Sequence, residues 1–87
     1  MERFYLDGYD MKSVQEFHRN IKEKLDFPAY YGHNLDALYD CLTEFQGQIV
    51  IVNVQVMKET LGQYFIRIVD VMEEAQLENS FLSIVFE

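Results

Sequence analysis

Acidic side chains recur at one-turn spacing in two separate segments of the chain. Asp36 and Asp40 are four residues apart in the first segment. The second segment contains Asp70, Glu74 and Glu78, which form a row at positions i, i+4 and i+8. Like charges at this spacing on a helix repel each other by about 0.2–0.5 kcal/mol per pair. A solvated helix face explains either row alone, whereas the two rows together predict an electronegative surface that binds cations.

The other reactive side chains form no recognisable catalytic site. Two aspartates at i and i+4 can share a divalent metal, but a metal or acid–base site needs more convergent ligands than these and His33 provide. His18 lies at the edge of an apolar stripe, so we expect a packed core histidine, and we expect His33 to be a solvated loop residue. Cys41 has no histidine at a spacing typical of nucleophilic catalysis. The sequence therefore predicts no metal site, no cofactor and no small-molecule substrate.

The net charge of −8 comes from 15 acidic and 7 basic residues. This sign opposes binding to a nucleic acid or to an anionic membrane. The charge is also uneven, because residues 1–25 contain five acidic and five basic groups and sum to zero. Residues 26–87 contain ten acidic groups against Lys58 and Arg67 and therefore carry the whole excess. We expect this part to present one acidic face that attracts a cationic partner.

A length of 87 residues corresponds to one domain, which we expect to span residues 1–87. With 49% hydrophobic and 15% aromatic residues, the chain can form a core, which excludes a disordered acidic tail. The single cysteine excludes an internal disulfide and fits a reducing compartment. We expect a cytoplasmic location, because the chain shows no signal-peptide pattern and no apolar run near the ~20 residues of a membrane span.

The first half of the chain predicts the elements that carry the first acidic pair. Residues 3–7 are aromatic and aliphatic and indicate a strand. Ser13 is a favourable cap for a helix that Pro28 is expected to stop. Asn34 is a favourable cap for a second helix over about 35–43, whose leucines mark the core face. A rotation of about 100° per residue places four polar or aromatic residues on the opposite face: Asp36, Tyr39, Asp40 and Thr43.

The second half of the chain predicts two strands and a long helix. The β-branched run at 49–54 is typical of a strand covered on both faces or buried in a parallel sheet. Residues 55–60 leave open whether a short helical turn forms. From Leu61, apolar residues at spacings of three and four predict a long helix to about Glu78. Residues 81–86 indicate the last strand.

This order of elements, β-α-α-β-α-β, predicts an α/β fold. A helix separates each pair of successive strands, so parallel pairing through right-handed crossovers is the simplest arrangement. We therefore expect a small three-stranded parallel sheet packed by helices.

The segment from Pro28 to Thr43, PAYYGHNLDALYDCLT, resembles the signature of the barstar family. The resemblance continues in the helix with Phe17 and His18 and in residues 71–75 with the closing strand, and it covers nearly the whole chain. It is loose around residues 55–63. Barstar is an intracellular bacterial inhibitor of a secreted ribonuclease, so the resemblance implies a barstar-like fold and an immunity protein without enzymatic activity.

The resemblance also implies roles for individual residues. The aspartate that matches Asp40 enters the phosphate-binding pocket of the nuclease, where its carboxylate replaces an RNA phosphate. The tyrosine that matches Tyr30 packs on the catalytic histidine, and the acids that match Asp36 and Glu74 contact arginine. The position of Glu78 adds to the acidic field. Four further residues match positions at or beside the interface: Gly32, Asn34, Leu35 and Thr43.

Four positions depart from the family pattern. Tyr39, which we include in the expected nuclease-binding set, and Phe45 both replace tryptophan. His33 replaces an acid, and Ser80 replaces a second cysteine. These changes keep the logic of an inhibitor but leave the identity of its target open.

The expected partner is a basic ribonuclease of the extracellular type, bound one to one. Two alternatives from other classes remain: a barstar-fold regulatory module that binds another basic protein, and a small metal-dependent enzyme. The set Tyr30, Asp36, Asp40 and Glu74 favours the inhibitor, because a repurposed module has no need to keep all four. Of the two adjacent tyrosines, we expect Tyr30 to contact the partner and Tyr31 to face inward.

Overall fold

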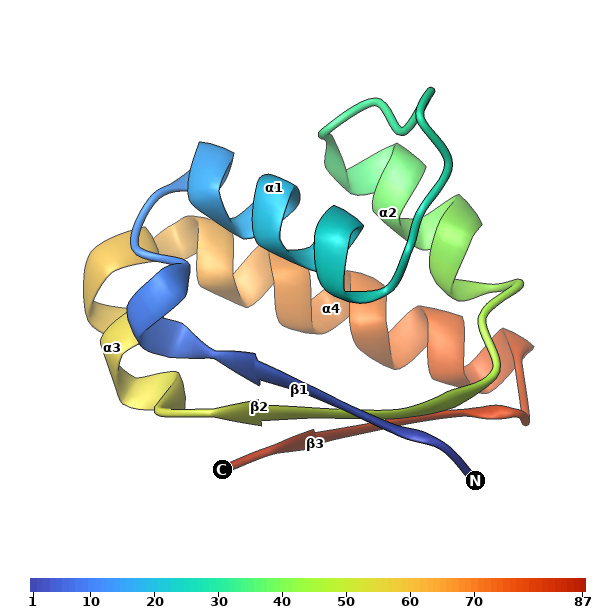
Figure 1. Cartoon of the computed structure of the whole chain (residues 1–87). Coiled ribbons are helices and arrows are strands. Elements are labelled where there is room, and N and C mark those ends of the chain that lie inside the picture. Colours follow the sequence, from blue (N-terminus) through green and yellow to red (C-terminus); the bar gives the residue numbers. More distant parts are fainter.

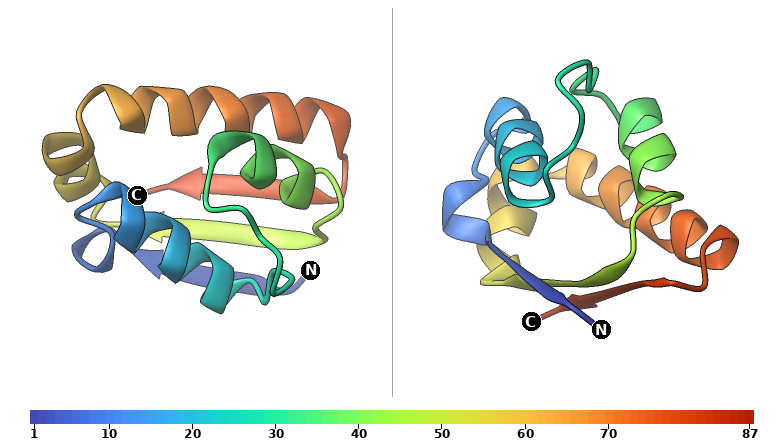
Figure 2. Two further views of the ribbon diagram at one scale, coloured as in Figure 1. Left: turned by 90° about the horizontal axis from the view of Figure 1, so that it is seen from above. Right: turned by 45° about the vertical axis from the view of Figure 1, so that its right-hand side comes forward.

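Helices cover one face of a small sheet and leave the other face open (Figure 1). The computed structural model describes residues 1–87. In chain order, its elements are β1 (Arg3–Asp7), a 3₁₀ helix η1 (Gly8–Asp10), α1 (Val14–Lys24), α2 (Leu35–Leu42), β2 (Gly47–Val52), α3 (Val54–Leu61), α4 (Gln63–Glu78) and β3 (Leu82–Phe86). Two further views show α1, α2 and α4 stacked above the sheet (Figure 2). This confirms the predicted α/β class and adds two short elements, η1 and α3, to the predicted order.

The sheet has the strand order β1-β2-β3, which the sequence left open. Both strand pairs are parallel, as predicted. Tyr5, Val50 and Val85 lie side by side across the three strands and point away from the helices. Leu6, on the next position of β1, is fully buried and belongs to the core. Successive side chains therefore alternate between the helical layer and the open face.

Of the two explanations for the apolar run at 49–54, the strand buried in a parallel sheet is confirmed, because β2 lies between β1 and β3 and is parallel to both. β2 spans Gly47–Val52, and the helices pack on one face of it. Val50 is only 5% exposed although it points to the open face. Its neighbours in the sheet, Tyr5 and Val85, shield it from both sides. A central strand is thus apolar on its open face without a second layer.

Left-handed backbone positions lie at three boundaries between elements, and two of these boundaries differ from the prediction. α1 ends at Lys24, ahead of Pro28 as predicted, and Asp26 in the loop that follows has φ 54°. Asn53 has φ 54° and ends β2, so α3 occupies the segment that the sequence left open. Gly62 has φ 58° and separates α3 from α4, so the long helix begins at Gln63 and not at Leu61.

Side-chain caps fix the helix ends that carry the site. Ser13 Oγ accepts a hydrogen bond from the Glu16 N–H, at 3.1 Å, as the predicted cap of α1 requires. At the far end of α4, the buried Asn79 side chain donates to the backbone oxygens of Leu42 (3.0 Å) and Phe45 (2.7 Å). Asn79 therefore joins the end of α4 to the end of α2.

Candidate functional site

The loop between α1 and α2 turns its two adjacent tyrosines in opposite directions. Tyr30 is 87% exposed, whereas Tyr31 is 5% exposed. A turn closed by the Tyr31 N–H donating to the Pro28 oxygen, at 2.9 Å, places the two rings on opposite sides of the chain. The predicted orientations are confirmed, and Tyr30 is left as a large ring with almost no contacts of its own.

Buried aromatic rings hold the inner side of this loop. The Tyr31 hydroxyl forms a 2.6 Å hydrogen bond with His18 Nδ1, and the Tyr31 ring lies 5.1 Å from that of Phe27. Burial is the main reason why the pKa of the Tyr31 phenol is raised. His18 is 1% exposed, which confirms the prediction of a core histidine. His33 is exposed in the loop, as expected.

Asn34 fixes the entry into α2. Its Oδ1 accepts from the Ala37 N–H at 2.8 Å, and its Nδ2 donates to the Gly32 oxygen at 3.1 Å. One amide side chain thereby caps the helix and closes the loop that precedes it. Gly32 and Asn34 are both exposed beside Tyr30 in sequence, and Leu35 is half-buried at the start of α2.

The two acidic segments meet in a shallow groove between α2 and α4. The groove has a volume of about 420 Å³ and is lined by Leu35, Asp36, Tyr39, Asp40, Val71 and Glu74. The structure therefore brings the pair on α2 next to the row on α4. Asp70, the first member of that row, does not line the groove. Val71 is the lining residue that the sequence reasoning missed, although it precedes Glu74 by about one helical turn.

The electrostatics of this groove are dominated by carboxylates. Partial burial raises the pKa of the Tyr39 phenol, and the negative charges of Glu78, Glu74 and Asp40 raise it further. The four carboxylates at positions 36, 40, 74 and 78 have neither a hydrogen bond nor a salt bridge within the chain, and all four are exposed. Such a cluster repels itself in the free protein and is stabilised by an added cation.

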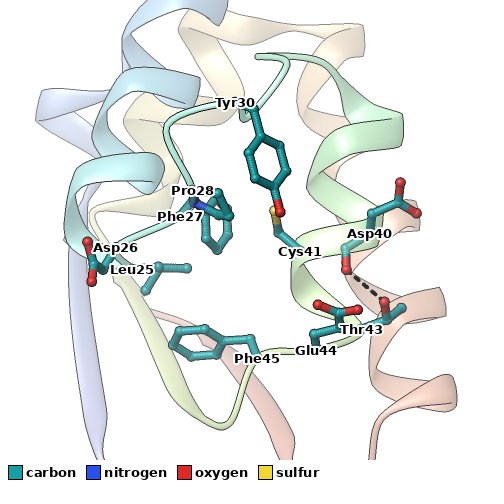
Figure 3. Close-up of a pocket in the computed structure, with 10 residues that line it drawn as sticks. All are labelled: Leu25, Asp26, Phe27, Pro28, Tyr30, Asp40, Cys41, Thr43, Glu44 and Phe45. Atoms are coloured by element: carbon teal, nitrogen blue, oxygen red, sulfur yellow. Dashed lines mark hydrogen bonds between the residues drawn. The ribbon is translucent and has the colours of Figure 1, made fainter.

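A second hollow lies on the other side of Asp40 (Figure 3). Its volume is about 500 Å³, and its wall runs from Tyr30 on the loop to the end of α2. Thr43 Oγ1 donates to the backbone oxygen of Asp40 at 2.8 Å and closes the last turn of α2. The lining residues are Leu25, Asp26, Phe27, Pro28, Tyr30, Asp40, Cys41, Thr43, Glu44 and Phe45. Asp40 borders both hollows and so occupies the middle of the surface.

The thiol of Cys41, in the wall of the second hollow, is poorly suited to nucleophilic chemistry. Its pKa is raised first by burial and then by the negative charges of Asp40 and Glu44. A thiol needs a lowered pKa to act as a nucleophile.

No group of three or more histidine, cysteine or acidic side chains is placed to hold a metal ion. No helix is long and apolar enough to cross a membrane.

Eight of the ten predicted site residues gather around these two hollows, whereas Gly32 and Asn34 line neither of them. Five of them line the groove between α2 and α4, namely Leu35, Asp36, Tyr39, Asp40 and Glu74. Tyr30 and Thr43 line the adjoining hollow, which also contains Asp40. Glu78 lies near enough to Tyr39 for its negative charge to raise the pKa of that phenol. We call the loop from Pro28 to Asn34, the outer faces of α2 and α4 and their two hollows the acidic face.

Comparison with known proteins places the chain in a class. The family model described as Barstar (barnase inhibitor) matches residues 1–86. The chain therefore belongs to the barstar family. It is 41% identical over 81 residues to a Bacillus subtilis (strain 168) protein named "Putative ribonuclease inhibitor YrdF", and the match spans 90% of this chain and 89% of that protein. These relationships support a role in ribonuclease inhibition.

Proposed function

We propose that this protein is a cytoplasmic immunity protein that binds one molecule of a basic ribonuclease through the acidic face and blocks its active site. The observation that carries the proposal is the position of Asp40. Its carboxylate is exposed and unpaired, and the residue lies between the two hollows of the face and lines both. A ribonuclease active site holds cationic groups for an RNA phosphate, and a carboxylate presented in this way can occupy that place.

The exposed ring of Tyr30 supplies the apolar part of the contact. Interfaces gain most of their affinity from a few buried aromatic or charged anchors at the centre of the patch. Tyr30 and Asp40 line the same hollow, so a single cationic and aromatic active site can contact both. By resemblance to the family, Tyr30 packs on the catalytic histidine of the nuclease while Asp40 enters the phosphate pocket.

The other acids set the direction of approach. Asp36 and Glu74 line the groove beside Asp40, and Glu78 adds charge at Tyr39. In the proposed complex, Asp36 and Glu74 contact arginines near the substrate site. Because the excess charge lies in residues 26–87, the field of the free protein attracts a basic partner before contact.

RNA hydrolysis by barnase and by a panel of other small basic ribonucleases tests the proposal. We expect the chain to inhibit at least one of them at a one-to-one ratio, and Asp40→Asn to weaken that inhibition at least tenfold. Asp70→Asn is the matched control, because it removes the same charge from α4 outside the groove. Equal losses from both variants would mean that only total charge matters. Failure to inhibit any ribonuclease, with binding to another basic protein, would favour the regulatory alternative.

A further inference from the structure

A buried histidine joins three elements beneath the acidic face. His18, on α1, is 1% exposed and bonds tyrosine hydroxyls through both ring nitrogens. Nδ1 lies 2.6 Å from the hydroxyl of Tyr31, in the loop, and Nε2 lies 2.7 Å from the hydroxyl of Tyr64, at the start of α4. Tyr31 and Tyr64 are 33 residues apart in sequence, so this connection is purely tertiary.

The chemistry of a neutral imidazole makes this connection directional. One ring nitrogen carries a proton and donates, while the other accepts, so one tyrosine hydroxyl accepts from His18 and the other donates to it. Burial, together with the nearby His33, lowers the pKa of His18 to about 4. The ring is therefore neutral near pH 7, and both of its nitrogens are satisfied. A ring held at both ends has little freedom to rotate.

The loop that carries Tyr30 has few other attachments. Within residues 28–33 the remaining hydrogen bonds are local, from the Tyr31 N–H to the Pro28 oxygen and from Asn34 Nδ2 to the Gly32 oxygen. Only the Tyr31 hydroxyl bonds this loop to a distant element. The position of the exposed Tyr30 ring therefore depends on how firmly its neighbour is held inside.

Tyr64 completes the attachment from the side of α4. It is half-buried, and the guanidinium of Arg67 lies 5.8 Å from the centre of its ring. The same helix carries Glu74 and Glu78 on the acidic face. Through His18, Tyr64 thus links the helix of the acidic row to the loop of the aromatic anchor.

We propose that Tyr64 is a positioning residue for partner binding, which acts through His18 and Tyr31 to hold Tyr30 in register with the acids of α4. Its effect on binding rests on the proposed function, whereas its effect on the loop does not. Because each hydrogen bond contributes about 0.5–1.5 kcal/mol net, its loss corresponds to about a two- to tenfold change.

The test uses Tyr64→Phe, which removes the hydroxyl and keeps the ring. Ile49→Val, at a fully buried position of β2, serves as a control of general destabilisation. In the free protein, we expect the Tyr31 amide to exchange its hydrogen about two- to tenfold faster in Tyr64→Phe after correction for global stability. We expect no such excess in Ile49→Val. Unchanged exchange in Tyr64→Phe would overturn the proposal whether or not the protein inhibits a ribonuclease.

The binding half of the test uses the ribonuclease that the unmodified chain inhibits, with barnase as the first choice. We expect Tyr64→Phe to dissociate about two- to tenfold faster than the unmodified protein. In a Tyr30→Ala background the same substitution should have no further effect, because the ring to be positioned is gone. An effect of equal size in both backgrounds would assign Tyr64 a structural role only and would overturn the proposal. If no ribonuclease binds, the proposed function fails, and the exchange experiment still decides the role of Tyr64 in the loop.

Discussion

The acidic face and the open face of the sheet are both solvent-exposed and both carry a large aromatic ring. Tyr30 is 87% exposed on the first, and Tyr5 is 57% exposed on the second. The open face also has a shallow hollow of about 250 Å³, lined by Arg3, Tyr5, Gln48, Val50, Val85 and Glu87. By exposure and shape alone, the two faces are similar.

Their charges separate them. The open face has charges of both signs, from Arg3 and Glu87, and its amide Gln48 Nε2 donates to Ser83 Oγ at 3.4 Å. The acidic face has carboxylates with no cation among them around Tyr39. Single exposed aromatic rings are common on protein surfaces. Unbalanced charge lowers the stability of the free protein, and such a cost is typical of a surface selected to bind a partner. The sign pattern, more than the exposed ring, therefore distinguishes the face for which we propose partner binding.

The largest expected effect follows the removal of the central carboxylate. Asp40→Ala should weaken inhibition by about 2–5 kcal/mol or more, because it leaves cations of the nuclease buried and unpaired. This range is informed by barnase–barstar itself and is thus inherited from the family. The free protein should gain about 0.5–1 kcal/mol, since alanine favours the helix and relieves repulsion from Asp36. Urea melts and inhibition assays measure both; a less stable mutant that still inhibits would make Asp40 a structural residue.

The two tyrosines of the loop should separate binding from folding. Tyr31→Ala should cost about 3–5 kcal/mol of stability, the usual loss for a buried aromatic side chain, and it leaves His18 Nδ1 unpaired. Tyr30→Ala should leave the melting temperature nearly unchanged and cost about 2 kcal/mol of affinity, mainly through faster dissociation. Thermal melts paired with dissociation rates of the two variants decide this, and the reverse pattern would contradict the assignment.

Low pH should destabilise the folded protein through His18, the buried histidine that bonds Tyr31 and Tyr64. The pKa of His18 falls from 6.5 to about 4 on folding, so between these values the unfolded chain binds more protons than the folded one. Stability contributed by His18 is therefore complete above pH 6.5 and is lost as the pH falls toward 4, by about 1–3 kcal/mol. Urea melts from pH 7 to pH 4 measure it. His33→Asn is the control, because His33 is exposed and its removal should leave most of this slope in place.

Added salt should slow association with the nuclease, because it screens the charge of the acidic face. Steered partners bind with on-rates of about 10⁸–10⁹ M⁻¹s⁻¹ at low salt, against about 10⁵–10⁶ M⁻¹s⁻¹ without steering. We expect the on-rate for the target nuclease to fall at least tenfold between low and physiological ionic strength. Stopped-flow mixing over a salt series measures it, and a flat profile would remove the steering role of the acidic face.

The smallest effect is expected on the open face. Tyr5→Ser removes a ring that is also exposed, although less than Tyr30, and that lies away from the unpaired acids. Inhibition should stay within about twofold of the unmodified protein, since the energy of an interface is concentrated in its few anchors. Inhibition assays beside Tyr30→Ala test this, and a comparable loss from both would mean that the partner also contacts the sheet.

Local signals account for what the sequence predicted well. The cap at Asn34 and the leucine spacing of α2 depend on neighbouring residues, and both were confirmed. The order of strands across the sheet depends on tertiary pairing, and the sequence left it open. The boundary at Gly62 was missed because apolar spacing continues across a residue with positive φ. The bond between His18 and Tyr64 joins residues 46 apart, and nothing in the local pattern indicates it. Surface acids could be grouped from the sequence, whereas the buried contacts that position them could not.

The hydrogen bonds from Asn79 to Leu42, the last residue of α2, and to Phe45, three residues later, affect the entropy of association. Two helices that carry like charges tend to splay apart, and the amide of Asn79 holds their ends together through the oxygens of Leu42 and Phe45. Binding then needs little rearrangement, because the acids are preorganised before the encounter. A flexible acidic segment would lose conformational entropy when it becomes ordered on binding, and this loss would lower its affinity. A segment that is already rigid avoids that loss.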